Sequence, residues 1–368
     1  MFSRYPGFAQ LPKQRQLVIV NRLWPHLGLQ ENTYVPKEYV DLLNYFSRVF
    51  AALHQHGQNF VFQDLEGPLD LVDDLKKHRA LTKEMLVWEV GKAHLARSIK
   101  DIARSIELAA RLWTGISISS KTLEVVPNWS RDSHIGWPTQ MTLAKAIEET
   151  IAGRFSSKAS SATIAEFAVD ESFTAVKLKK ICRFHIQWTD NLTDHLRTKG
   201  DRGKRILSIY RHKILLVNHL KDPVSTAINS TVLDEAIRTL DLLFPFGDSK
   251  TADFLEAEGV NFYSVSFGNS RPDDLSAFVH WRYNLAFLMQ ILHGPPETVT
   301  QTLTDTRNLS QFATLWVAIF GVFALTIVFG ILTTVYSIKS YRVAFDSYDL
   351  ALAAACEEFP LLPHCQRL

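Results

Sequence analysis

The amino-acid sequence predicts a mainly α-helical protein with a small α+β section, built as a helical cytosolic body followed by one C-terminal transmembrane helix. Three observations lead to this fold class. Apolar side chains recur at helical spacing, one short segment alternates at period two, and residues 308–338 contain no Asp, Glu, Lys, Arg or His. We expect an all-helical region 1–155, a mixed helix and small-sheet region 160–300, a transmembrane helix 311–338 and a C-terminal tail 339–368.

Two stretches of the N-terminal region carry apolar side chains on one helical face, at i, i+3, i+4 and i+7. The first face consists of Tyr39, Leu42, Leu43, Phe46, Val49, Phe50 and Leu53. The second consists of Ile99, Ile102, Ile106, Ala109 and Trp113. Such a face packs against a hydrophobic core, so we predict two core-facing helices. The Ser- and Ala-rich segment 156–162 is the predicted linker to the next region.

The mixed region contains the clearest strand, at residues 183–189. In it, Phe184, Ile186 and Trp188 alternate with Arg183, His185, Gln187 and Thr189. This alternation predicts one buried and one solvated face. Asp190 is a candidate N-cap for a short helix that ends near Leu196. Either 206–210 or 214–217 is expected to supply a partner strand.

Two further amphipathic helices follow in the mixed region. The apolar positions of the first are Leu233, Ala236, Ile237, Leu240, Leu243 and Phe244, and Pro245 and Gly247 end it. Those of the second are Phe278, Trp281, Leu285, Leu288 and Leu292. Asp273 and Asp274 are its candidate N-caps, and the sequence Gly-Pro-Pro at 294–296 ends it.

The charge-free stretch predicts a membrane-spanning helix. At about 1.5 Å per residue, a core of roughly 25 residues covers a hydrocarbon layer of about 30 Å. Trp316 and Tyr336 lie near its ends, where aromatic rings favour the headgroup region, and Lys339 and Arg342 follow. A buried core helix is the alternative, but core helices seldom run this long without a charge. We therefore expect the protein to be inserted in a membrane.

The orientation of the helix is inferred from the segment 1–28, which contains neither the basic nor the apolar region of a signal peptide. We therefore expect the body to lie in the cytosol. Lys339 and Arg342 after the helix, against Arg307 before it, favour a cytosolic tail by the positive-inside rule. Passing the short tail across the membrane is nevertheless an easier step than exporting the body. The identity of the membrane stays open.

Composition agrees with a mostly soluble protein that carries one anchor, since 46% hydrophobic and 21% charged residues are ordinary globular values. The three cysteines, Cys182, Cys356 and Cys365, are too few for a disulfide-built fold. The last two lie nine residues apart, and a bridge between them requires a lumenal tail. Palmitoylation or two free thiols is the favoured expectation.

Several sequence blocks resemble proteins of one group. They are Phe173-Thr-Ala175, the segment 186–196, the segment 239–245, His280-Trp-Arg282 and Gly294-Pro-Pro296, followed by the charge-free helix. On these blocks the chain is similar, over residues 100–338, to a broad group of uncharacterised filamentous-fungal proteins with a C-terminal transmembrane helix. The resemblance implies no activity, cofactor or catalytic residue that can be carried over to this sequence.

Motifs for catalysis or metal binding are not found. The sequence Gly-Asp-Arg-Gly-Lys-Arg at 200–205 lacks the first Gly and the final Ser or Thr of a phosphate-binding loop, and HExxH, CxxC and GxSxG motifs do not occur. Asp190, Asp194, His185 and His195 carry groups suited to acid–base or metal chemistry, but their spacing favours structural roles. We expect neither a cofactor nor a metal, and we can name no catalytic residue.

Positive charge is concentrated in residues 177–213, which contain eleven Lys and Arg against three Asp, a net charge of +8 in a chain of +2. This basic segment predicts a candidate site for anionic lipid or an acidic protein, with a solvated face as the plain alternative. Nucleic acid is a disfavoured ligand, because Phe184 and Trp188 have the pattern of core residues. The candidate binding residues are Lys177, Lys179, Lys180, Lys199, Arg202, Lys204 and Arg205.

Within the charge-free helix, Thr326, Gly330 and Thr334 recur at every fourth residue. Small residues at this spacing allow a second helix to approach closely. They are therefore candidates for helix packing and homo-oligomerisation through the transmembrane segment.

Together these features favour a single-pass, membrane-anchored interaction or scaffold protein that binds a protein partner. An enzyme with an unrecognised site, or a peripheral binder of anionic lipid or nucleic acid, is the alternative. Asn-x-Ser/Thr sequences begin at Asn128, Asn191, Asn229 and Asn308. Since glycans are added in the lumen, a cytosolic body predicts that none of them is modified.

Overall fold

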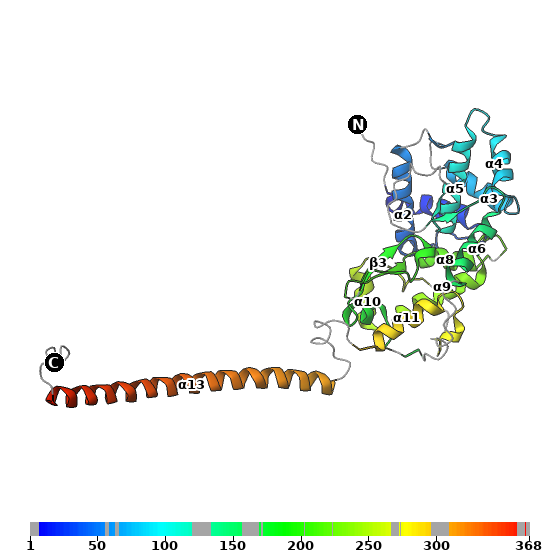
Figure 1. The fold of residues 1–368 in the computed structure, drawn as a ribbon. Helices are drawn as coiled ribbons and strands as arrows, with labels where there is room; N and C mark the ends of the chain where they lie inside the picture. The colour runs from blue at the N-terminus through cyan, green and yellow to red at the C-terminus, as the bar shows by residue number, and fades with distance from the viewer. Residues whose placement is uncertain are drawn as a thin grey trace. The chain divides into compact units, whose positions relative to one another are not determined.

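The computed structural model describes residues 7–55, 59–62, 66–119, 134–156, 169–170, 172–201, 203–222, 224–265, 272, 274–295, 309–358 and 365. It forms two compact units, a body within residues 1–298 and a C-terminal unit within 299–368. Helices dominate both units, and a small sheet lies in the body (Figure 1). The predicted fold class, mainly α with a small α+β section and a long apolar C-terminal helix, is confirmed.

The helices of the body vary from 6 to 20 residues. They are α1 (Lys13–Leu23), α2 (Pro36–Gln55), α3 (Glu66–Lys77), α4 (Lys83–Gly91), α5 (Ile99–Thr114), α6 (Leu143–Ser156), α7 (Ala175–Lys180), α8 (Lys213–Leu220), α9 (Ser230–Leu243), α10 (Ser249–Ala257) and α11 (Arg282–His293). Short 3₁₀ helices occur at η1 (Phe8–Gln10), η2 (Pro25–Leu27), η4 (Leu192–Asp194) and η5 (Leu275–Ala277). The predicted amphipathic stretches correspond to α2, α5, α9 and α11.

The main sheet has the strand order β3-β5-β4. Its strands are β3 (His185–Thr189), β4 (Thr198–Lys199) and β5 (Ile206–Tyr210), and β1 (Ile118–Ser119) and β2 (Ile135–Gly136) form a separate parallel pair. β5 is parallel to β3 and antiparallel to β4. The prediction of 206–210 as the partner strand is confirmed, whereas 214–217 belongs to α8. Thr189, predicted on the wet face, is buried.

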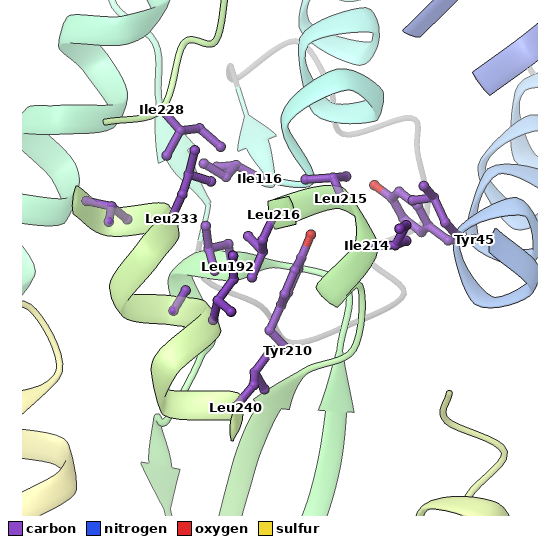
Figure 2. Packing of buried hydrophobic residues seen from close by; sticks show 14 of the residues in the cluster. Tyr45, Ile116, Leu192, Tyr210, Ile214, Leu215, Leu216, Ile228, Leu233 and Leu240 are labelled. Atoms are coloured by element: carbon purple, nitrogen blue, oxygen red, sulfur yellow. The ribbon is translucent and has the colours of Figure 1, made fainter. Parts of the chain in front are cut away.

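One hydrophobic core extends through the body, from Phe8 to Leu292. It combines residues from both sides of the predicted linker, including Ile116 from the N-terminal region and Leu192, Leu215, Leu216 and Leu233 from the mixed region (Figure 2). Residues 157–162 of that linker lie outside the described residues, so the division of the body into two regions stays a prediction. Ile99, predicted to face the core, is instead 75% exposed because it is the first residue of α5.

The capping residues differ from those predicted for two helices. Asn191, not Asp190, caps η4 by accepting a hydrogen bond from the backbone N–H of Thr193. Asp274 caps the short η5, and Asp273 lies outside the described residues. α11 begins at Arg282, and the backbone N–H groups just before it donate to the buried carboxylate of Glu235 on α9. The N-terminal cap of α11 is therefore a tertiary contact, supplied by a side chain of another helix.

The C-terminal unit is dominated by α13 (Leu309–Glu358), a continuous helix of 50 residues. At about 1.5 Å per residue such a helix is about 75 Å long, more than twice the thickness of a hydrocarbon layer. The helix therefore continues beyond the predicted end of the anchor at 338, through the first part of the tail. A disulfide joins Cys356 in its last turns to Cys365, with the two Cα atoms 5.4 Å apart. The favoured expectation of free or palmitoylated thiols is thus wrong.

Candidate functional site

α13 is the helix among the described residues that is long and apolar enough to cross a membrane, between Ala313 and Glu358. No part of its most apolar 18-residue window is buried against other residues. Large side chains such as Val317, Phe320 and Phe329 are 71%, 63% and 62% exposed. Apolar side chains arranged around a whole helix need an apolar surrounding, so α13 is a candidate membrane anchor.

The predicted small-residue face lies on this helix. The hydroxyl groups of Thr326 and Thr334 donate to the carbonyl oxygens of Val322 and Gly330, each at 2.8 Å. Both hydroxyls are therefore satisfied within the helix, as is usual for threonine in an apolar medium. A Cβ added at Gly330 would meet no atom within 4 Å, so the face is open. Helix packing through it stays a prediction.

The positive charge that the basic segment presents at the surface is smaller than the net charge of its sequence. Among the described residues, cations of the segment pair with carboxylates, and most of these carboxylates come from outside the segment. Examples are Lys179–Glu258 at 3.0 Å, Arg197–Asp194 at 3.0 Å, Arg211–Asp41 at 2.7 Å and Lys213–Asp241. Lys213 is buried, with an exposed fraction of 1%. The net charge of +8 therefore overstates what this part of the surface presents.

The predicted binding residues of the segment do not share one environment. Lys177, Lys179 and Lys180 are exposed on α7, and Lys204 is exposed before β5. Lys199 and Arg205 are half-buried, and the Arg205 guanidinium lies 5.9 Å from the centre of the Phe287 ring. Arg202 lies outside the described residues. Lys177, Lys180 and Lys204 are thus exposed, whereas the exposed Lys179 is paired with Glu258.

The four residues considered for acid–base or metal chemistry lie in separate environments. His195 is buried, with Nε2 2.7 Å from the Thr239 hydroxyl and Nδ1 accepting from the Tyr210 backbone N–H. Burial lowers the pKa of His195 to about 3. Asp194 pairs with Arg197, whereas His185 is exposed on β3. Within the described part of the chain, no three His, Cys, Asp or Glu side chains are grouped to hold a metal ion.

Asp190 lies between two basic side chains, from α2 and from the end of β5. One carboxylate oxygen is 2.8 Å from the Arg48 guanidinium of α2, and the other is 2.7 Å from Nε2 of the buried His212. Burial raises the pKa of Asp190, but the hydrogen bond and charge of His212, together with Arg48, outweigh it and hold this pKa well below its usual range. The ionised Asp190 carboxylate therefore links Arg48 of α2 to His212 at the end of β5.

A pocket of about 230 Å³ lies between the end of α1, η2, α3, α5 and the end of α8. Its lining includes the polar side chains of His26, Lys76, His219 and Asp222. An enzyme needs a pocket in which such groups converge, and sequence reasoning missed this one. The lining residues are scattered between positions 23 and 226, and no motif connects them.

Large apolar side chains are exposed on α4 and in the segment that follows it. They are Met85 and Trp88 on α4, Leu95 after it and Ile99 at the start of α5, and we call these four residues the apolar corner. Their exposed fractions are 55%, 67%, 89% and 75%. The Lys92 ammonium lies 3.9 Å from the centre of the Trp88 ring. Periodicity did not single out this surface, because α4 is short and weakly amphipathic.

In the comparisons with known proteins, no family model, no curated protein and no solved structure matches this chain.

Proposed function

We propose that this protein is a single-pass membrane protein whose body lies in the cytosol and binds a protein partner through the apolar corner. α13 supports the anchoring, because a fully exposed apolar helix of this length is unfavourable in water. The Cys356–Cys365 disulfide supports the orientation, because disulfides persist outside the reducing cytosol. With α13 as the crossing helix, a tail outside the cytosol puts the body inside it.

The exposure of Trp88 is the observation that carries the interaction function. Tryptophan and methionine are enriched in protein interfaces, and most of the binding energy comes from a few such side chains. Met85 and Trp88 are three residues apart on α4, so they share one face of that helix. At 67% exposed, Trp88 leaves most of a large apolar ring in water. A partner that covers the ring would gain the corresponding hydrophobic free energy.

Site-specific crosslinking of the full-length protein in its own membrane tests the partner surface. The double variant Met85→Ala, Trp88→Ala should lose the crosslinked partner and keep its melting temperature, because neither side chain is part of the core. Phe246→Ala is the matched control, since Phe246 is an aromatic residue outside the apolar corner and is 70% exposed. Equal crosslinking by the corner variant and the control would contradict the proposal.

Glycosylation tests the orientation. Asn229 is exposed and would be accessible to the glycosylation machinery in a lumenal body, whereas Asn191 is buried and already bonded to Asp194. We expect Asn229 to stay unmodified and an Asn-Gly-Ser sequence appended after Leu368 to be glycosylated. An endoglycosidase-sensitive shift that depends on Asn229 would reverse the orientation.

Binding of anionic lipid is a second candidate function, favoured by the exposed lysines of α7. Exposed cations near a negatively charged membrane gain about 1 kcal/mol each. With the full-length protein held in phosphatidylcholine nanodiscs, changing Lys177, Lys180 and Lys204 to Glu should abolish the capture of phosphatidylserine vesicles. Unchanged capture, or the same loss with phosphatidylcholine vesicles, would exclude this function, and DNA retention by the same variants tests nucleic acid. The matched control carries Glu at the exposed positions Lys37, Lys100 and Lys250.

A further inference from the structure

The pocket beside η2 is large enough for a small organic molecule. Its volume of about 230 Å³ corresponds to roughly eight water molecules at about 30 Å³ each. Elements from distant parts of the body build it, so its shape depends on the folded core and not on one loop. The nature of its ligand can be inferred from the charges and rings that line it.

Lys76 supplies a positive charge that the surrounding residues compensate only in part. Its ammonium group donates to the carbonyl oxygen of Arg22 at 2.8 Å, and the nearest carboxylate oxygen, on Asp73, is 3.6 Å away. The other oxygen of Asp73 accepts from the Arg22 guanidinium at 3.0 Å. Burial lowers the pKa of Lys76, which means that the charged form is poorly solvated there. An anion in the pocket would compensate it.

His26 and Asp222 are held by contacts within the lining. His26 places Nε2 2.9 Å from the carbonyl oxygen of Asn218 and Nδ1 3.3 Å from a carboxylate oxygen of Asp222. The Asp222 carboxylate also accepts from the Ser225 backbone N–H at 3.1 Å. Asp222 is therefore already bonded, whereas the Lys76 ammonium has no carboxylate oxygen closer than 3.6 Å among the described residues.

Aromatic rings form the apolar part of the lining. The His219 ring lies between Trp24 and Trp113, with ring centroids 5.8 Å and 5.7 Å away. Burial lowers the pKa of His219 to about 4, so this ring is neutral near pH 7. Trp24 is 1% exposed, and its indole N–H has no hydrogen-bond partner among the described residues. The lining thus offers aromatic surface together with one spare buried donor.

We infer that this pocket binds a small carboxylate with an aromatic or other apolar body. The carboxylate compensates the Lys76 ammonium, and the apolar body packs against the indole rings of Trp24 and Trp113. A neutral aromatic molecule adds no negative charge beside the lysine. Inorganic phosphate leaves the apolar lining unfilled. Both should therefore bind more weakly than a molecule that has the two parts together.

Calorimetric titration of the detergent-solubilised full-length protein tests this site, with benzoate as the probe and benzyl alcohol and inorganic phosphate as comparison ligands. Benzoate should bind saturably in the millimolar range, and both comparison ligands at least about tenfold more weakly. Lys76→Met should weaken benzoate binding by about tenfold or more. Lys77→Met is the matched control, since Lys77 is the exposed neighbour on α3 and does not line the pocket.

Thr226→Phe provides an independent variant in case Lys76→Met does not fold. Thr226 lines the pocket and forms none of the ion pairs described above, so the larger side chain fills the space without breaking them. It should abolish benzoate binding and leave the thermal unfolding of the body nearly unchanged. Three results would each overturn the inference: no saturable benzoate binding by the unaltered protein, equal binding by the Lys76 and Lys77 variants, or benzyl alcohol or phosphate binding as tightly as benzoate.

Discussion

Replacing Glu235 by Ala removes the tertiary cap of α11. The Glu235 carboxylate is 2% exposed and accepts from the backbone N–H groups of Val279 at 2.8 Å, His280 at 2.8 Å and Trp281 at 2.6 Å. A buried donor left without a partner costs about 1–3 kcal/mol. Trp281 is buried, whereas Val279 and His280 reach the surface, where water can replace the carboxylate. The lost negative charge at a helix N-terminus adds to the cost of the unpaired donor, so we expect Glu235→Ala to lower the free energy of unfolding by about 3 kcal/mol.

Urea unfolding of the full-length protein in detergent, followed by tryptophan fluorescence, measures this change. Glu235→Gln keeps one acceptor oxygen and should lose about half as much free energy as Glu235→Ala. Glu256→Ala is the control, because Glu256 is exposed on α10, and it should change the free energy of unfolding by less than about 0.5 kcal/mol. If Glu235→Ala unfolds at the same urea concentration as this control, the carboxylate does not stabilise α11 and the reasoning is refuted.

Three further predictions concern the buried groups of the body. Burial lowers the pKa of His195 to about 3 and that of His219 to about 4. As the pH falls through about 6.5, the unfolded chain takes up these protons first, so the free energy of unfolding at pH 5 should be lower by about 2 kcal/mol per histidine, measured by urea midpoints. Gly115 has a φ of +64°, and a Cβ there would lie 2.3 Å from the Tyr210 hydroxyl, so Gly115→Ala should destabilise the body by about 2–4 kcal/mol in the same assay. The Tyr210 hydroxyl is buried without a hydrogen-bond partner among the described residues, so Tyr210→Phe should raise the free energy of unfolding by about 1 kcal/mol, and a fall would show that the hydroxyl is solvated or bonded.

The spacing of apolar residues within short segments correctly predicted several helices and one strand. The spacing of Leu233, Ala236 and Ile237 identified α9, and the alternation around Ile186 identified β3, because each backbone form sets its own period for the buried face. Phe278 marks the limit of this approach. It shares the apolar period of α11 but precedes the helix, because boundaries depend on caps, and the cap here comes from Glu235 on another helix.

The basic segment shows why charge along the chain does not predict a surface. The carboxylate that neutralises Arg211 is 170 residues away, on α2, and the one that neutralises Lys213 is 28 residues away, on α9. A buried cation needs a partner wherever the fold can bring one, and sequence separation does not restrict that choice. The pocket could not be predicted from the sequence for the same reason, because its lysine, histidines and indoles come together only when α1, α3, α5 and α8 pack.

The sequence by itself determined the mainly helical body and the apolar helix predicted at 311–338, because periodicity and the cost of apolar surface in water are local properties of the chain. Only the tertiary structure decided which carboxylate pairs with which cation, that Cys356 meets Cys365, and that Trp88 stays exposed while Trp24 and Trp113 line a pocket. These outcomes depend on contacts between elements far apart in sequence, where packing and the need to satisfy buried polar groups select the partners.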